Sequence, residues 1–345
     1  MSAAQIIVSI IIITIRTSIR VKGKLKSKNY GVAVNPDGVG MPRANILGVG
    51  VSTINMEMAL DTIFDWVSNG EPHYVCVSNV HTIMESQRDQ TLKRIHNCAG
   101  VVTPDGMPLV WLSRLMGFRH VERVYGPDLL LAVCERSTKP GYRHFFYGGA
   151  PGVAEKLAVR LQSRFPGLQV AGIYCPPFRR LTSEEDRGVV EQINSSKPDI
   201  VWVGIGTPKQ DRWMAEHVGR LRAPVLVGVG AAFDFHAGLK KQAPVWMQKS
   251  GLEWSFRLMT EPRRLWRRYL IDNPFFLWLV FLQILGRKPA DSHGDLRPSN
   301  RANVKIRELS LMKRNMTTAD RVAARLHNLW RKRGEHVKRE RFEDG

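Results

Sequence analysis

Residues 201–213, VWVGIGTPKQDRW, join an apolar run to a glycine-rich turn and then to polar side chains. Gly204, Gly206 and Pro208 form the turn, and Gln210 follows it. Glycine turns at the ends of buried strands present backbone N–H groups, which bind phosphate oxygens. An ordinary strand-to-helix connection has the same appearance, so this stretch alone leaves both interpretations open.

Polar residues and glycines follow several other apolar runs of the chain: Asn79, Asp105, Gly148, Gly149, Gly230 and Asp234. Apolar runs that alternate with amphipathic segments predict a mostly parallel sheet covered by helices on both faces. In such an α/β sheet the ligand binds outside the carboxyl ends of the strands. We therefore expect these residues to line one site.

The pattern along the chain predicts where the strands and helices lie. Strands are predicted at 44–52, 73–80, 100–106, 143–149, 168–174, 199–206 and 223–230. Helices are predicted at 55–68, from about 81, and at 107–116, 151–165, 183–196 and 209–221.

The glycine turns do not match the fingerprints of the common nucleotide cofactors. GVGVST at 48, GIGTPK at 204 and GVGAAF at 228 each lack the third small residue of the dinucleotide motif, and GxxxxGK[ST] is absent. A nucleotide-sugar epimerase or dehydrogenase is therefore a disfavoured alternative, and we expect no cofactor.

The positive charge of the chain lies mainly at its two ends. The chain has 345 residues and a net charge of +20, of which residues 1–43 contribute +6 and residues 257–345 contribute +11. Basic ends suit nucleic acid or an anionic membrane surface, or they act only as solubilising tails.

The four cysteines form no CxxC pair, so the sequence predicts neither a disulfide framework nor a structural zinc site.

Composition divides the chain into four parts. Residues 1–43 are a basic extension with an apolar run too short to span a bilayer. Residues 44–250 form the α/β domain, 251–290 an arginine-rich amphipathic appendage, and 291–345 a basic polar tail. The appendage mixes arginine with Trp, Phe and Leu, as interfacial elements do, although simple docking on the core is the alternative. This mixture disfavours the other hypothesis, a basic-tailed nucleic-acid-binding protein.

Five motifs in series give the chain a family resemblance: TPDGMPLVW, VGIGTPKQDRW, GVGAAFDFHAG, QAPVWMQKSGLEWSFRL and EPRRLWRRYL. Together they closely resemble the WecG/TagA/CpsF family of bacterial glycosyltransferases, over roughly residues 44 to 285. The resemblance implies a Rossmann-like core and a C-terminal appendage that closes over the site at the membrane. It also implies inverting, metal-independent transfer from a UDP-sugar to a sugar on undecaprenyl diphosphate, in exopolysaccharide or cell-wall glycan synthesis.

The resemblance assigns the catalytic residues by position. Asp105 matches the family's proposed general base, which takes the proton of the acceptor hydroxyl. Asn79 matches an active-site Asn, and Arg123 lies in another family motif. The Thr that often precedes this Asn by two residues is Val77 here, which leaves the donor sugar open.

The resemblance also assigns substrate contacts. Gln210 matches the Gln of a GxPxQE element, whose Glu is shortened to Asp211 here, and Asp234 matches a residue near the nucleotide. The family's arginines thought to meet a diphosphate correspond to Arg257, Arg264 and Arg267. Without a metal, guanidinium groups must stabilise the leaving UDP.

The expected partners follow from this interpretation. They are a UDP-sugar donor with an N-acetylmannosamine-type, glucose or uronic acid sugar, a polyprenyl-diphosphate-linked acceptor and an anionic membrane surface. We expect a cytoplasmic enzyme, peripheral on the inner face of the plasma membrane, with no nucleic-acid partner. The sequence leaves open whether it forms a homo-oligomer.

Overall fold

The computed structural model describes residues 41–286, so nearly all of the predicted N-terminal extension and the whole predicted tail lie outside the described residues. The central feature is a six-stranded parallel sheet in the order β4-β3-β8-β7-β5-β6. Its strands are β3 (His73–Ser78), β4 (Val101–Pro104), β5 (Arg143–Gly148), β6 (Gln169–Tyr174), β7 (Ile200–Gly204) and β8 (Val225–Gly228). The expected α/β fold with a parallel sheet is confirmed.

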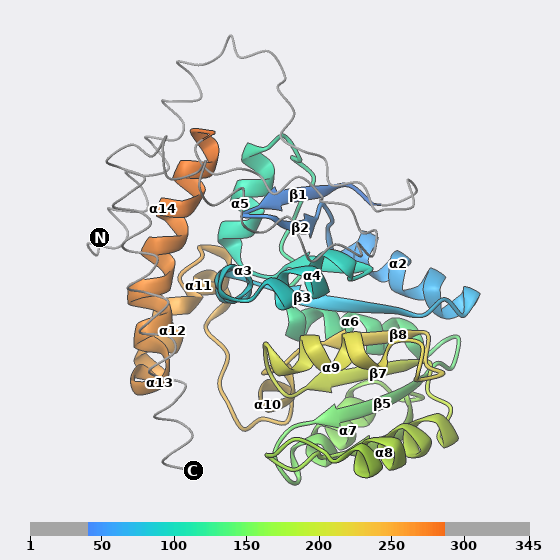
Figure 1. Ribbon diagram of the computed structural model, residues 1–345. Helices are drawn as coiled ribbons and strands as arrows, with labels where there is room; N and C mark the ends of the chain where they lie inside the picture. Colours follow the sequence, from blue (N-terminus) through green and yellow to red (C-terminus); the bar gives the residue numbers. More distant parts are fainter. Residues whose placement is uncertain (1–40, 287–345) are drawn as a thin grey trace. The chain divides into compact units, whose positions relative to one another are not determined.

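Helices cover both faces of this sheet, as Figure 1 shows. On one face, α2 (Met56–Asn69), α6 (Gly126–Ser137), α7 (Val153–Arg164) and α10 (Ala232–His236) share the main hydrophobic core with the strands. On the other face lie α3 (Val80–Arg88), α4 (Gln90–Cys98), α8 (Ser183–Ser195) and α9 (Lys209–His217). Neighbouring residues of β5 show the two faces, because Phe146 belongs to that core while Tyr147 stacks on Trp213 of α9.

The predicted strand 44–52 was wrong, because this segment is an antiparallel hairpin. Its strands are β1 (Arg43–Ile46) and β2 (Val49–Ser52). Leu47 and Gly48 form the turn with φ angles of 54° and 82°, the pair of positive values that a tight hairpin turn requires. The side chain of Asn45 accepts the N–H of Gly48 at 2.8 Å. An apolar Leu in the turn hid the break from the hydrophobic pattern.

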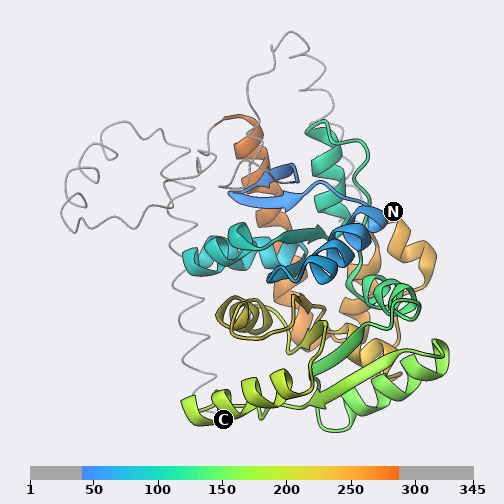
Figure 2. The same ribbon diagram turned by 90° about the vertical axis from the view of Figure 1, so that its right-hand side faces the viewer.

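The C-terminal appendage is helical and packs on the core. It comprises α11 (Val245–Lys249), α12 (Glu253–Thr260), α13 (Pro262–Arg267), a π-helical turn η1 (Arg268–Asp272) and α14 (Asn273–Ile284). Gln283 of α14 accepts the N–H of Leu47 at 2.9 Å and donates to the carbonyl of Asn45 at 2.8 Å. Asp272 pairs with Arg88 of α3, and Figures 1 and 2 show α14 beside α3 and the hairpin.

No helix within residues 41–286 has the length and apolar character that a membrane crossing requires. The twelve residues of α14 extend the appendage along the core and bury Phe276, Leu279 and Val280.

The carboxyl ends of β5 and β7 approach too closely for side chains. A Cβ atom on Gly204 would lie 2.7 Å from the Phe233 ring, and one on Gly148 would lie 2.7 Å from the backbone of Gly204. Glycine at these strand ends is therefore a packing requirement as well as a turn signal.

Two glycine-to-alanine variants should have opposite effects on stability. Gly204→Ala should lower the free energy of unfolding by about 1–3 kcal/mol, because the added methyl group overlaps the Phe233 ring. Gly188→Ala, in the exposed interior of α8 with open space around it, should raise it by about 0.5–1 kcal/mol. Urea unfolding measures both values, and equal midpoints would contradict the packing described here.

Candidate active site

The order of the strands brings the predicted polar residues to one edge of the sheet. The chain moves from β3 to β4 toward one side and from β5 to β6 toward the other, and β8 and β7 fill the space between. Because all neighbouring strands are parallel, the carboxyl ends of β3, β8, β7 and β5 are adjacent. This is the region where open α/β sheets bind their ligands.

Asp105 directly follows β4, and both of its carboxylate oxygens have partners. Oδ1 accepts the backbone N–H of Gly126 at 3.1 Å, and Oδ2 accepts the side-chain amide of Asn79 at 3.4 Å. Its own N–H donates to the carbonyl of Ser78 at 2.9 Å, which ties it to the end of β3. The residue is 9% exposed, so the carboxylate is held in one orientation at the edge of the core.

Asn79 connects three structural elements through one side chain. It caps α3, because its Oδ1 accepts the N–H groups of His81 at 3.1 Å and Thr82 at 3.4 Å. The same oxygen accepts Nη2 of Arg268 at 3.1 Å. These donors fix the amide so that its nitrogen faces Asp105. Asn79 therefore orients the carboxylate and also receives a residue of the appendage.

Arg123 links the Asp105 turn to the appendage. Its Nε donates to the carbonyl of Asp105, and its Nη2 pairs with Glu253 of α12. The Tyr125 hydroxyl donates to Glu253 at 3.3 Å, and the Arg123 guanidinium lies 4.0 Å from the centre of the Tyr125 ring. These contacts dock α12 directly beside Asp105.

The pKa of Asp105 is raised above its ordinary value. Burial is the main cause, and the nearby Glu253 carboxylate acts in the same direction. The positive charge of Arg123 and the hydrogen bonds from Gly126 and Asn79 lower the pKa of Asp105 and partly offset the increase. A carboxylate with a raised pKa binds a proton more readily, which suits a general base.

Gln210 supports the glycine turns beyond β7 and β8. Its side chain is buried, and its Oε1 accepts the N–H of Gly206 at 3.2 Å. A Cβ on Gly230 would lie 3.4 Å from the same oxygen. Pro208, which begins the turn into α9, follows a cis peptide bond. Gln210 therefore holds both turns in place from beneath.

Gly126 joins the Asp105 turn to these glycine turns. A Cβ on Gly126 would lie 3.2 Å from Val77 and 3.6 Å from the carbonyl oxygen of Val229. Val229 directly precedes Gly230. Gly126 therefore fills the space between the Asp105 carboxylate and the glycine turn after β8, and it packs against Val77.

At the ends of β5 and β7, Gly149 donates its N–H to the carbonyl of Gly204 at 3.0 Å. Asp234 lies further along the same edge, in α10. Its carboxylate pairs with Lys240 at 3.0 Å, and the Lys240 ammonium is 3.8 Å from Glu261, which precedes α13. Lys240 thus connects Asp234 to the appendage.

The predicted arginines of the appendage occupy different surroundings. Arg257 is half-buried, and Tyr269, Glu253, Tyr125 and Asp105 raise its pKa, outweighing the opposite effect of burial. Arg264 is exposed and pairs with Glu261. Arg267 is exposed and lies over the Trp266 ring at 5.3 Å. The structure brings Arg257 toward Asp105, whereas Arg264 and Arg267 lie at the surface.

Sequence reasoning did not assign site roles to Arg268, Glu253 and His81. Burial, followed by Arg268, Arg88, Arg257 and Arg264, lowers the pKa of His81 well below its ordinary value. His81 is therefore neutral and lies in a positive potential at the start of α3. The EPRRLWRR motif contains four arginines, and the motif alone does not show that Arg268 is the one that contacts Asn79.

Comparison with known proteins identifies one family of glycosyltransferases. The family model of the Glycosyl transferase WecG/TagA/CpsF family matches residues 44–290. The N-acetylglucosaminyldiphosphoundecaprenol N-acetyl-beta-D-mannosaminyltransferase of Bacillus spizizenii is 31% identical over 197 residues, which cover 57% of this chain and 74% of that protein. The Staphylococcus aureus protein with the same description is 26% identical over 240 residues, which cover 69% of this chain and 92% of that protein. Since the family match covers well over half of the chain, this glycosyltransferase belongs to the WecG/TagA/CpsF family.

Proposed function

We propose that this glycosyltransferase moves a sugar from a UDP-sugar to a sugar carried on undecaprenyl diphosphate, with inversion and without a metal ion. The two relatives are named for such an acceptor and for an N-acetylmannosaminyl transfer. The observation that carries the proposal is Asp105, whose carboxylate is held by Gly126 and Asn79 beside the glycine turns.

Asp105 is the proposed general base. Its Oδ2 makes only a long hydrogen bond to Asn79, so it retains capacity to accept a proton from the acceptor hydroxyl. As that proton moves to Asp105, the hydroxyl oxygen forms a bond to the anomeric carbon. The bond between the anomeric carbon and UDP breaks on the opposite side, which inverts the configuration, and the electron pair leaves with UDP.

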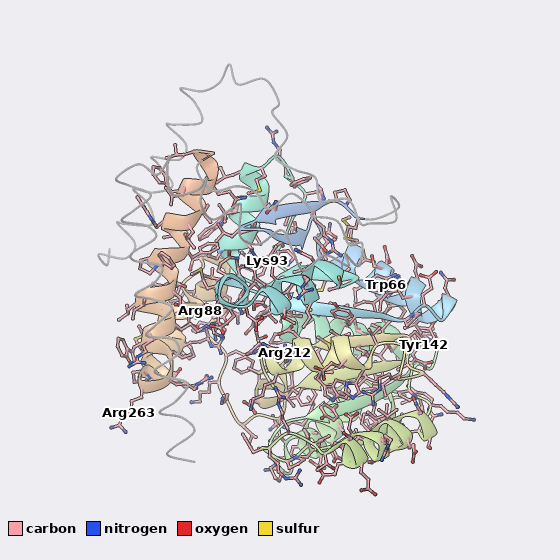
Figure 3. All side chains as sticks on the ribbon, in the orientation of Figure 1. Trp66, Arg88, Lys93, Tyr142, Arg212 and Arg263 are labelled. Atoms are coloured by element: carbon pink, nitrogen blue, oxygen red, sulfur yellow. The ribbon has the colours of Figure 1, made fainter. Side chains whose placement is uncertain are left out.

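The positive charges around α3 are the proposed stabilisers of the diphosphate. The N-terminus of α3 carries a partial positive charge, and Arg257 and Arg268 converge on it. Arg88, which Figure 3 shows on the side of the core that faces the C-terminal helices, also contributes to this potential. Guanidinium groups form strong, charge-assisted hydrogen bonds to phosphate oxygens, so they can serve the role that a metal ion has in other transferases.

The glycine turns are the proposed UDP site. Gly148 and Gly204 end strands β5 and β7, and Gly149, Gly206 and Gly230 follow the ends of the central strands. The N–H groups of Gly149, Gly206 and Gly230 bond within the protein, to Gly204, Gln210 and Val203, so these turns would receive UDP through the room that glycine leaves at this edge of the sheet. Gln210 supports these turns from beneath, and Asp234 lies at the adjacent helix α10. The buried methyl groups of Val77 pack against Gly126. Since Val77 offers no hydroxyl to a donor sugar, the proposal includes three donors: an N-acetylmannosamine-type sugar, glucose or a uronic acid.

The appendage is the proposed contact with the inner face of the plasma membrane. Among residues 41–286, seven of the eleven large apolar side chains that are exposed belong to α11–α14 and η1: Val245, Trp246, Met259, Trp266, Leu270, Ile271 and Trp278. Arg263 extends outward from the same helices, as Figure 3 shows. Exposed aromatic and aliphatic side chains combined with arginine are typical of interfacial helices. Lipid contact at this position would bring the polyprenyl acceptor to Asp105.

Asp105→Asn should lower the rate of transfer by about 10²–10⁴-fold, because the amide does not accept the hydroxyl proton. The dissociation constant for UDP should stay unchanged, since the carboxylate is not part of the glycine turns. Radiolabelled UDP-sugar with a diphosphoprenol-linked acceptor measures transfer, and calorimetry measures UDP binding. Asp128→Asn is the matched control, because this neighbouring carboxyl is exposed but experiences the same Arg123 and Glu253 charges. Near-normal transfer by Asp105→Asn would remove the base assignment.

The pH profile should move in opposite directions in two variants. A base must be deprotonated, so kcat/KM should rise with pH through the pKa of Asp105. Glu253→Gln removes a charge that raises this pKa, and the acid limb should shift to lower pH. Arg123→Gln removes a charge that lowers it, and the limb should shift to higher pH. Shifts in the same direction, or none, would contradict this electrostatic assignment.

Replacing Met259, Trp266 and Leu270 together by Ser should weaken binding to vesicles that contain phosphatidylglycerol by at least ~100-fold, because each buried apolar side chain contributes ~1.5–3 kcal/mol. Flotation measures binding. The control replaces Val159 and Phe178 by Ser. Both are exposed apolar residues of the α/β domain, so this variant should float like the unmodified protein. Loss of flotation in the control alone, or displacement of the vesicles by DNA, would count against the membrane contact.

A further inference from the structure

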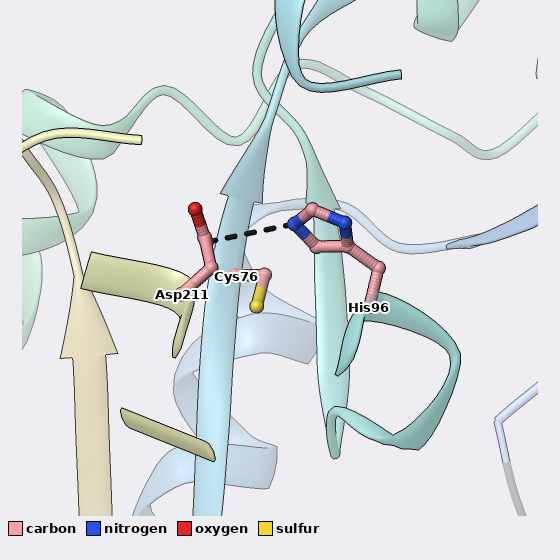
Figure 4. A group of neighbouring side chains, drawn as sticks. All are labelled: Cys76, His96 and Asp211. Carbon is pink, nitrogen blue, oxygen red and sulfur yellow. Dashed lines mark ion pairs between the residues drawn. The ribbon is translucent and has the colours of Figure 1, made fainter. Parts of the chain in front are cut away.

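Three buried side chains from distant parts of the sequence meet beneath the glycine turns. Cys76 comes from β3, His96 from α4 and Asp211 from α9, and each is 0% exposed. Their ligand atoms, one from each residue, all lie within 4.8 Å of one another. Figure 4 shows the His96 imidazole facing the Asp211 carboxylate, with the Cys76 side chain beside the pair.

The polar atoms that face this point lack hydrogen-bond partners. Nε2 of His96 and both carboxylate oxygens of Asp211 are buried without one. Leaving such atoms unsatisfied costs about 1–3 kcal/mol each, and more for a charged group. Asp211 interacts with the Cys76 thiol and faces the His96 imidazole, and one cation bound among the three side chains would satisfy all of these atoms together.

The hydrogen bonds of Ser86 indicate which nitrogen of His96 carries the proton. The Ser86 hydroxyl donates its single hydrogen to the carbonyl of Thr82 at 3.0 Å. Its oxygen, 3.0 Å from Nδ1 of His96, therefore accepts the Nδ1 proton. In the neutral ring this leaves a lone pair on Nε2, directed at the carboxylate. A histidine that donates through one nitrogen and offers the other is the usual state of a metal ligand.

The distance between His96 and Asp211 fits a shared cation better than a direct hydrogen bond. Nε2 of His96 and Oδ1 of Asp211 are 3.5 Å apart. A charge-assisted hydrogen bond has a length of about 2.7–2.9 Å. Two ligands at ~2.0–2.1 Å from a tetrahedral zinc ion are about 3.3–3.4 Å apart. The Cys76 sulfur lies within 4.8 Å of a ligand atom of each partner, and its side chain would move toward them to bind the same ion.

We propose that Cys76, His96 and Asp211 form a buried structural site for one zinc-type divalent cation. Thiolate, imidazole and carboxylate are ligands that zinc accepts together, and the two negative ligands neutralise its charge. The second Asp211 oxygen or a water completes the tetrahedron. The thiol proton passes to solvent when the ion binds.

This ion would fix the base of the glycine turns. Asp211 follows Gln210, which holds the N–H of Gly206, and Cys76 precedes the Ser78 carbonyl that accepts from Asp105. The site therefore stabilises the fold under the candidate active site and takes no part in transfer. Its existence does not depend on the proposed function.

The test uses the full chain, purified without metal and titrated with Co²⁺ as a spectroscopic probe for zinc. One Co²⁺ per chain should bind with a thiolate-to-cobalt charge-transfer band and tetrahedral visible bands, and Zn²⁺ should displace it and raise the melting temperature. Cys76→Ser should remove the charge-transfer band. Ser86→Ala, which removes a partner of a ligand, should lower the affinity for Co²⁺ by about 10–100-fold. Cys76→Ser should lower it by more than that.

Cys134→Ser is the matched control, because Cys134 is an equally buried free cysteine of the core and should keep the band. The metal site is wrong if the wild-type protein takes up no stoichiometric Co²⁺ or is not stabilised by Zn²⁺. A bridging water or a direct ion pair would then connect the three side chains. A band that survives in Cys76→Ser overturns it too. The wild-type measurements remain decisive even where a variant does not fold.

Discussion

The side chain of Asn79 is the contact on which the candidate site depends. Its oxygen caps α3 and accepts Arg268 from the appendage, and these contacts turn its nitrogen toward Asp105. One amide thus sets the start of a helix, the position of a carboxylate and the docking of a distant segment. Because the cap and Arg268 share the oxygen while Asp105 accepts from the nitrogen, each contact favours the orientation that the others require.

The charges around Asp105 keep its pKa raised although several arginines lie nearby. Arg123 would lower the pKa of Asp105 strongly if it were alone, but Glu253 neutralises part of its effect and burial acts in the opposite direction. Arg257 and Arg268 are left to give the start of α3 a positive potential. The same appendage therefore supplies both the anion that adjusts the base and the cations proposed to bind the diphosphate.

The sequence predicted the sheet and the residues at its edge, because apolar strands followed by polar turns depend on local pattern alone. Asn79, Asp105 and Gln210 could be placed in this way. The hairpin at Leu47 was missed because an apolar residue occupies its turn. The contact of Arg268 with Asn79 joins residues 189 positions apart and depends on how the appendage packs on the core. The convergence of Cys76, His96 and Asp211 depends on tertiary packing, which no spacing rule reveals.

The contact of Gln283 with Asn45 and Leu47 joins the two ends of the described chain. Glu253 and Arg268, which complete the surroundings of Asp105, are among the last described residues to leave the ribosome. All six strands of the central sheet therefore precede these residues along the chain, and under the proposed function a chain that ends before Glu253 lacks part of the surroundings of the base.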